Sequence, residues 1–323
     1  MIILLPNTID LDLANSSNPS IAGATAPNDD TVIVYDAKRP FADEHLAADV
    51  LVVWQNTPEN LHDAATRLSQ LRLVQTLAAG PDAALAAGFR DTVAIASGRS
   101  LHDGPVAEHA LALILAAVRS LDELLESQRE HEWNTAVNTA QVARATSGRY
   151  TLDRAQVTIW GFGSIAATLA PVLRMLGATV TGVASTTGIR HGFDVVAASD
   201  ATELLARTDV LVSVLPASPE TTDTFGAALF GALKPGAIFV NVGRGATVDE
   251  AALIDALESG QLRSAALDVT KVEPLPAESA LWDAPHLILT PHIAGNRPQG
   301  AAGLVRANVE ALHTGAALTN LVS

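Results

Sequence analysis

The sequence predicts an α/β protein with two parallel β-sheets, each covered by helices on both faces. Short apolar segments alternate with segments of helical periodicity along the chain, and this pattern is typical of doubly wound parallel sheets. The alternation runs as two series, one on each side of a long apolar segment. Because 323 residues suffice for two domains, we expect one sheet from each series.

The first series covers residues 2–96. Helices are expected over 42–48 and 61–71 from the spacing of their apolar residues. Apolar runs rich in β-branched residues predict the strands between them. These strands are expected at 2–5, 31–35, 50–54, 73–77 and 93–96.

A long helix is expected in the middle of the chain. Asp103 and Pro105 mark its start, because Asp favours the position before a helix and Pro its first turn. Residues 106–125 are apolar around most of the helix circumference, which requires burial between domains or subunits. Residues 130–150 are weakly periodic and rich in Asn, Thr and Ser, and predict an extended loop or arm.

The second series begins at Val157 and repeats the alternating plan. A final amphipathic helix is expected over 299–314. The strands of this series are expected at 157–160, 179–183, 210–214, 237–242, 264–268 and 287–290.

Composition excludes several classes of function. The chain has 20 basic and 35 acidic residues and a net charge of −15, which argues against nucleic acid or an anionic membrane as partner. It has no cysteine, which excludes disulfides and thiolate chemistry and fits a cytoplasmic location. The short apolar start at 1–7 predicts a strand rather than a signal peptide. The histidines lack paired metal-ligand spacing, so no metal site is expected.

A glycine-rich turn, GFGSIA at 161–166, follows the first strand of the second series and leads into a helical pattern. Gly161 permits a tight turn, Gly163 lets backbone amides approach a pyrophosphate, and the small Ala166 allows the helix to pack closely on the strand. The helix N-terminus then faces the phosphates. The turn therefore predicts a dinucleotide site, with an ordinary strand–turn–helix as the alternative.

The segment after the next strand indicates which dinucleotide is bound. NAD sites normally place a carboxylate there for the ribose hydroxyls, but residues 184–191 contain none. Ser185, Thr186 and Arg190 are instead suited to a 2′-phosphate. NADP is therefore favoured over NAD, although a variant loop that binds NAD through its backbone is the alternative.

Three further side chains, each at or after the end of a predicted strand, predict reaction chemistry. Arg244, between two glycines, can bind a carboxylate and polarise a carbonyl. His292 is the natural proton donor to a carbonyl oxygen, and Glu273 can fix its tautomer and favour the imidazolium. Taken singly, each has a structural explanation: a surface arginine, a helix-capping histidine or a solvated glutamate. Their joint occurrence favours hydride transfer to a small acid.

These features together resemble the D-isomer-specific 2-hydroxyacid dehydrogenases, a family that includes glyoxylate/hydroxypyruvate reductases and phosphoglycerate dehydrogenase. The resemblance covers most of the chain and is weakest in its first 70 or so residues. Besides the glycine turn and the segments around Arg244, Glu273 and His292, it rests on TLAAGPD at 76–82, VAEH at 106–109, LPASPET at 215–221, KPG at 234–236 and LW at 281–282.

The resemblance implies a Rossmann-type dinucleotide-binding domain, residues 101–290, inserted into a flavodoxin-like substrate-binding domain made of 1–100 and 291–323. It also implies a homodimer formed through the helix near Val106 and the arm after it. Arg244 would bind the substrate carboxylate and carbonyl, His292 would be the acid/base, and Glu273 would orient it. The substrate contacts would be Ala79, Gly80, Arg244 and His292, and the cofactor contacts Gly161, Gly163, Ser164, Ile165, Ser185, Thr186, Arg190, Pro216, Val242 and Asp268.

This chain departs from the family pattern at several positions. Ala184 and Ser185 stand where NAD-preferring members carry Asp, which supports NADP. Pro81 replaces a common Val and has no amide hydrogen, which predicts a changed loop shape.

The expected activity is NAD(P)H-dependent reduction of a small 2-oxoacid, of the glyoxylate or hydroxypyruvate type, to the D-2-hydroxy acid. One alternative is an NAD-linked phosphoglycerate dehydrogenase, but no basic cluster stands where the substrate phosphate would bind. The other is a non-catalytic nucleotide-sensing protein, which the absence of a basic patch disfavours. The sequence leaves open which 2-oxoacid is used and in which direction the reaction runs.

Overall fold

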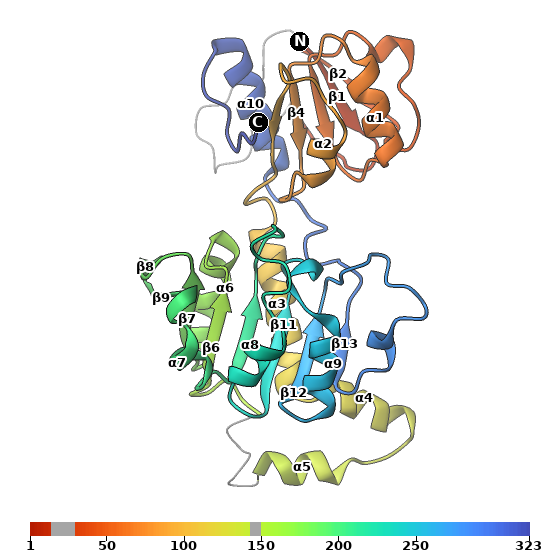
Figure 1. Cartoon of the computed structure of the whole chain (residues 1–323). Coiled ribbons are helices and arrows are strands. Elements are labelled where there is room, and N and C mark those ends of the chain that lie inside the picture. Colours follow the sequence, from red (N-terminus) through yellow and green to blue (C-terminus); the bar gives the residue numbers. More distant parts are fainter. Residues whose placement is uncertain (14–29, 143–149) are drawn as a thin grey trace. The chain divides into compact units, whose positions relative to one another are not determined.

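The computed structural model describes residues 1–13, 30–142 and 150–323 and divides them into two compact units. Unit 1 consists of Met1–His102 and Arg297–Ser323, and unit 2 of Asp103–Asn296. The chain therefore leaves the first unit, forms the second and returns to the first (Figure 1). The domain boundaries expected after residues 100 and 290 lie a few residues before those of the units.

Unit 1 contains a five-stranded sheet in which all strands are parallel. Its order, β2-β1-β3-β4-β5, is that of flavodoxin-like sheets. Successive residues of one strand enter different clusters: Leu4 packs in one core, and Ile3 and Leu5 in the other. Both faces are therefore buried, as in most parallel sheets. The strands are β1 (Ile2–Pro6), β2 (Thr31–Tyr35), β3 (Val50–Val53), β4 (Leu73–Thr76) and β5 (Ala94–Ala96).

The helices of unit 1 are α1 (Pro58–Arg67), α2 (Asp82–Ala86) and α10 (Ala301–Thr314). Thr57 caps α1, since its hydroxyl accepts a hydrogen bond from the Asn60 amide at 3.2 Å. The helix predicted over 42–48 is wrong: the structure has only a 3₁₀ turn at Asp43–His45. Contacts with α1 hold the start of this segment: Asp63 accepts from the amide of the preceding residue, Phe41, at 2.7 Å, and Arg67 pairs with Asp43 at 3.2 Å.

Unit 2 contains an eight-stranded sheet of order β13-β12-β11-β10-β6-β7-β9-β8. From β9 to β12 the strands are parallel and follow, in chain order, the 3-2-1-4-5-6 arrangement of dinucleotide-binding sheets. This confirms the predicted α/β class. The sequence analysis predicted neither of the two strands at one edge, β9, which is parallel to β7, and β8, which runs antiparallel to β9. The strands are β6 (Gln156–Trp160), β7 (Thr179–Ala184), β8 (Gly188–Arg190), β9 (Phe193–Ala197), β10 (Val210–Ser213), β11 (Ala237–Asn241), β12 (Leu262–Leu267) and β13 (Leu287–Leu289).

The long apolar segment forms two helices rather than the single helix predicted. α3 (Asp103–Val118) ends before residue 125, and α4 (Leu121–Arg129) continues after a bend of 66°. At the bend Ser120 has a left-handed backbone, φ +51°, and its hydroxyl accepts a hydrogen bond from Arg263 at 3.1 Å. α3 is buried within unit 2, where Ala110 and Ile114 belong to its main core cluster.

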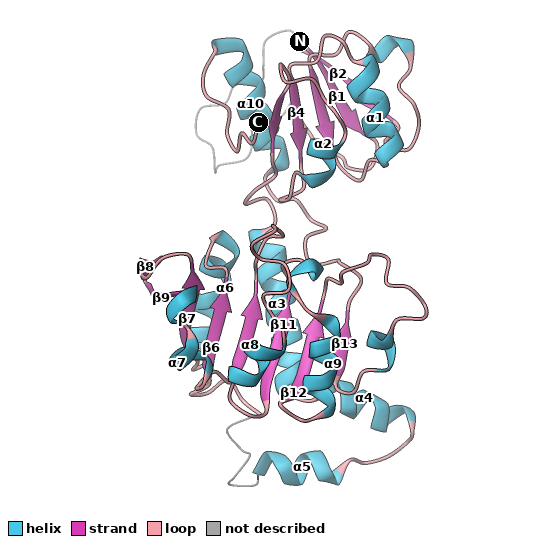
Figure 2. Ribbon diagram, in the orientation of Figure 1, coloured by secondary structure: helices cyan, strands magenta, loops and turns pink. Residues whose placement is uncertain are grey.

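The segment predicted as an arm contains a further helix, α5 (Thr135–Val142), while its part at 143–149 lies outside the described residues. Figure 2 shows helices on both faces of the sheet of unit 2. No single described helix is both long and apolar enough to cross a membrane; only the bent pair α3 and α4 reaches that length and composition together. The remaining helices are α6 (Ser164–Met175), α7 (Thr202–Leu205), α8 (Ala227–Ala232) and α9 (Glu250–Glu258).

Candidate active site

The glycine turn lies where the strand order of unit 2 reverses. β6 and β10 are neighbours there, and ligands of such sheets bind in the crevice at their carboxyl ends. Gly161 has a left-handed backbone, φ +98°, and a Cβ at this position would stand 2.7 Å from the Val214 carbonyl oxygen after β10. Only glycine therefore fits this close approach of the two loops.

The N-terminus of α6 fits a pyrophosphate. Gly163 is the N-cap, no side chain caps the helix, and a Cβ on Gly163 would meet open space. The first amides of this helix are therefore available to an anion. Ser164 lies beside them, and its hydroxyl donates to Asp103 at 2.9 Å, while Ile165 packs against the core of unit 2.

The segment after β7 carries the side chains predicted to select the cofactor. Ser185 and Thr186 are exposed, and Arg190 lies on β8. The Arg190 guanidinium donates to the Thr186 hydroxyl at 2.7 Å. A guanidinium beside exposed hydroxyls fits a phosphate group, and residues 184–191 contain no carboxylate that would repel it.

Arg244, Glu273 and His292 follow three neighbouring strands, β11, β12 and β13 (Figure 1). Parallel strands place their carboxyl ends at the same edge of a sheet. His292 Nδ1 lies 2.6 Å from Glu273 Oε2, and the other carboxylate oxygen accepts from the Thr270 amide at 3.0 Å. The structure thus brings the predicted imidazole and carboxylate into contact.

The His292 ring is available to a substrate. Its side chain is 47% exposed, and Nε2 has no partner among the described residues. An imidazole that is paired with a carboxylate through Nδ1 and has an open Nε2 can act as a general acid or base.

The Arg244 turn is fixed by residues that the sequence analysis did not identify. Asn241 is fully buried; its amide group donates to the Arg244 carbonyl at 3.1 Å and accepts from the Gly243 amide at 3.0 Å. The Thr247 hydroxyl donates to the same carbonyl at 2.6 Å. Asn at the end of an otherwise apolar strand was the signal available in the sequence.

Both glycines beside Arg244 are required by close packing. A Cβ on Gly243 would stand 2.5 Å from the Leu215 carbonyl oxygen, and one on Gly245 would stand 2.0 Å from the Thr270 carbonyl carbon. The Arg244 guanidinium itself donates to the Gly243 carbonyl at 2.8 Å. Within the described contacts, Arg244 does not bond to Glu273 or His292.

The remaining predicted cofactor contacts lie in the same unit. Pro216 is exposed after β10, and Val242 is buried after β11. Asp268, after β12, is 1% exposed and accepts hydrogen bonds from Thr290 and from the amides of Ile293 and Ala294.

Ala79 and Gly80, predicted to contact substrate, lie in unit 1 in the loop after β4. Their amides donate to no other described residue, so they are available to an anion. His102 and Gly98 hold the preceding residues: His102 Nε2 lies 2.7 Å from the Leu77 carbonyl oxygen, and the Gly98 amide donates to Ala78 at 2.8 Å. Pro81, which lacks an amide hydrogen, is the N-cap of α2.

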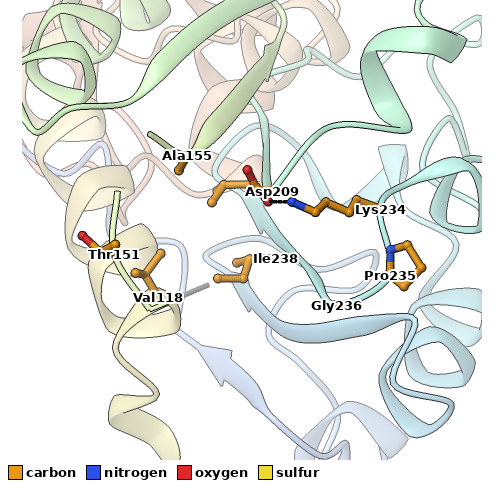
Figure 3. A pocket seen from close by; sticks show the side chains of 9 residues that line it. Val118, Thr151, Ala155, Asp209, Lys234, Pro235, Gly236 and Ile238 are labelled. Carbon is orange, nitrogen blue, oxygen red and sulfur yellow. Dashed lines mark hydrogen bonds and ion pairs between the residues drawn. The ribbon is translucent and has the colours of Figure 1, made fainter. Parts of the chain in front are cut away.

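A cavity elsewhere in unit 2 is too small to be a ligand site. It lies at the start of β10 and β11, beside the 2.5 Å ion pair of Lys234 with Asp209 (Figure 3). Its volume of about 10 Å³ holds at most one water molecule. In the described part of the chain, no group of three or more His, Cys, Asp or Glu side chains is arranged to hold a metal.

Comparison with known proteins gives a consistent result. Residues 111–294 match the model of the D-isomer specific 2-hydroxyacid dehydrogenase NAD binding domain. Glyoxylate/hydroxypyruvate reductase A of Serratia proteamaculans is 31% identical over 277 residues, which cover 83% of this chain and 84% of that protein. D-3-phosphoglycerate dehydrogenase of Mycobacterium bovis is 34% identical, but the match covers 59% of this chain and only 34% of that protein.

Several solved structures match the whole chain. A D-isomer specific 2-hydroxyacid dehydrogenase family protein from Aeromonas salmonicida is 28% identical, with a TM-score of 0.78 over 100% of this chain and 98% of that one. The NADPH-dependent glyoxylate/hydroxypyruvate reductase of Sinorhizobium meliloti, solved with NADP and sulfate, is 26% identical, with a TM-score of 0.77 and the same coverage.

Proposed function

Because this chain belongs to the D-isomer specific 2-hydroxyacid dehydrogenase family, we propose that it reduces glyoxylate, hydroxypyruvate or a similarly small 2-oxoacid to the D-2-hydroxy acid. NADPH is the preferred reductant. The observation that carries the proposal is the 2.6 Å contact between His292 and Glu273 at the carboxyl end of a dinucleotide-binding sheet. The reductase matched over most of its length supports the substrate class.

When bound, the reduced nicotinamide supplies the hydride for C2 of the substrate. His292 donates the proton to the carbonyl oxygen from Nε2. Glu273 accepts the Nδ1 hydrogen, which fixes the tautomer and stabilises the imidazolium before the proton is given away. Arg244 binds the substrate carboxylate and polarises the carbonyl.

Each unit has a proposed role. Unit 2 is the dinucleotide-binding domain, and the cofactor contacts are those predicted from the sequence, from Gly161 to Asp268. Unit 1 is the substrate-binding domain, in which the free amides of Ala79 and Gly80 bind the substrate carboxylate. We also propose that Asp268 accepts a hydrogen bond from the nicotinamide carboxamide, in addition to the hydrogen bonds that it already receives.

The preference for NADPH rests on the segment after β7. Arg190 and Thr186 form a donor pair, Ser185 is exposed, and no acidic side chain is present. The Sinorhizobium meliloti structure, with NADP bound, supports the same cofactor. A 2′-phosphate is thus bound where NAD-selective sites carry a carboxylate.

Homodimer formation is part of the proposal. α4 and α5 line an open groove of about 590 Å³, and apolar side chains of this region are exposed, with Leu125 at 50% and Trp133 at 88%. Exposed apolar surface of this kind marks an interface. A cytoplasmic location is also proposed, since a chain without cysteine requires no oxidising compartment.

The first experiment is oxidation of NADPH and NADH, side by side, with glyoxylate, hydroxypyruvate, pyruvate and bulkier 2-oxoacids. Rapid use of NADPH with the small substrates is the expected result. An NADH-linked activity on 3-phosphohydroxypyruvate alone would favour phosphoglycerate dehydrogenase, which the Mycobacterium bovis match also supports. Tight cofactor binding without turnover of any substrate would favour a nucleotide-sensing protein.

A further inference from the structure

The position of the His292 ring depends on its backbone. The contact described for the ring is the hydrogen bond with Glu273, and the side chain is otherwise half exposed. The backbone of His292 is left-handed, φ +52°, a conformation that non-glycine residues keep only where the surroundings hold it. Whatever fixes residues 290–294 therefore fixes the proposed proton donor.

One buried residue, Asp268, receives the hydrogen bonds that fix this segment. Its carboxylate accepts from the amides of Ile293 and Ala294, each at 3.0 Å. Its carbonyl accepts from the His292 amide at 2.8 Å. The Thr290 hydroxyl donates to the same carboxylate at 2.7 Å. Asp268 is 1% exposed, so water does not replace these partners.

His109 reaches this group from a different element, the helix α3. Its Nε2 lies 3.0 Å from the Thr290 hydroxyl oxygen and 3.3 Å from Asp268 Oδ1. Thr290 has one hydroxyl proton, which it gives to Asp268, so its oxygen faces His109 as an acceptor. The carboxylate is an acceptor as well. Two acceptors facing one nitrogen require that Nε2 of His109 carries a hydrogen.

We propose that His109 is a positioning residue for the reaction: its Nε2 hydrogen bonds Thr290 and Asp268, and through them holds His292 in its left-handed conformation. This inference rests on the proposed role of His292. His109 makes no contact with His292 itself among the described residues, and it acts only through the segment that carries the proton donor. The Arg244 turn and the glycine turn are held in place by the other contacts described above.

The test compares two substitutions of His109. His109→Phe keeps a ring but removes the donor, whereas His109→Gln offers an amide NH₂ in place of Nε2. We expect kcat of the Phe variant to fall by roughly tenfold or more, since small misplacement of a catalytic group has effects of this size. KM for the 2-oxoacid should change by less than about threefold, and the Gln variant should recover most of kcat.

A second variant, Thr290→Val, removes the hydroxyl that links His109 to Asp268 and keeps the side-chain shape. It should lower kcat in the same way, and combining it with His109→Phe should add little, because coupled residues are not additive. A Phe variant with wild-type kcat, or Phe and Gln variants that are equally impaired, would overturn the proposal.

His292→Gln is measured in parallel to separate two kinds of failure. If it is inactive while His109→Phe is fully active, the role of His109 is wrong and the proposed function stands. If His292→Gln is as active as wild type, the assignment of the proton donor fails, and the inference fails with it.

Discussion

At the scale of single residues, the proposed function depends on His292, whose ring contacts Glu273 at 2.6 Å and is otherwise open. Replacing His292 with Gln removes the proton donor but keeps a polar side chain of similar size. We expect kcat to fall by roughly 10²- to 10⁴-fold, the range of general acid–base catalysis. NADPH affinity, measured by fluorescence titration, should stay close to wild type, because the glycine turn is separate. Wild-type turnover would remove His292 from the chemistry.

Tyr35 gives a residue-scale prediction about stability. Burial raises the pKa of its phenol, and the hydrogen bond that Asn56 donates at 2.7 Å only partly opposes this effect. The folded state therefore holds the proton more tightly than the unfolded state. The resulting stabilisation is complete below the unfolded pKa of about 10 and is lost as pH rises above it.

Urea unfolding of wild type and Tyr35→Phe, near pH 8 and near pH 11, tests this prediction. The phenylalanine variant has no group to ionise. Its unfolding free energy should therefore fall less between the two pH values than that of wild type. Parallel losses in both proteins would show that Tyr35 does not contribute to alkaline unfolding.

At the scale of elements, the site depends on close contact between the turn after β11 and the loop after β12. Gly245→Ala would place a Cβ 2.0 Å from the Thr270 carbonyl carbon and displace the loop that carries Glu273. Overpacking of this kind costs about 1–3 kcal/mol of unfolding free energy. We expect the variant to lose both stability and kcat/KM, as measured by thermal unfolding and by NADPH oxidation.

A matched glycine in a helix serves as control. Gly231 lies inside α8, where a Cβ would meet no atom within 4 Å. Gly231→Ala should raise stability by about 0.5–1 kcal/mol, since glycine is unfavourable within a helix. Its activity should not change. If both alanines behaved alike, the contact at Gly245 would not be what limits the site.

At the scale of the whole molecule, the exposed apolar side chains of α4 and α5 predict association. Leu125→Glu places a charge in the proposed interface, so light scattering after gel filtration should change from twice the mass of the chain to the mass of one chain. Met175→Glu is the control, because Met175 is 78% exposed on α6, away from the groove. A wild-type protein that is monomeric at high concentration would contradict the proposal.

The sequence by itself determined the fold class and the chemical types of the site. Most of the parallel strands are continuous apolar runs buried on both faces, so their positions along the chain are visible without coordinates. β9 was missed because the exposed Asp194 interrupts its apolar run. The glycine turn was visible because Gly161 meets a local backbone requirement. The family followed from these motifs and was confirmed by comparison.

Tertiary structure decided what depends on residues far apart in sequence. The helical spacing of apolar residues continues through Ser120 in the sequence. In the structure, however, α3 ends just before Ser120, which has a left-handed backbone and accepts a hydrogen bond from Arg263. The 42–48 segment has helical spacing, yet it forms only a 3₁₀ turn, whose Asp43 pairs with Arg67 of α1. The bond of Glu273 to His292 and the approach of His109 to Asp268 join separate elements. Spacing along a chain carries no information about such contacts, because packing alone sets which strand and helix ends meet.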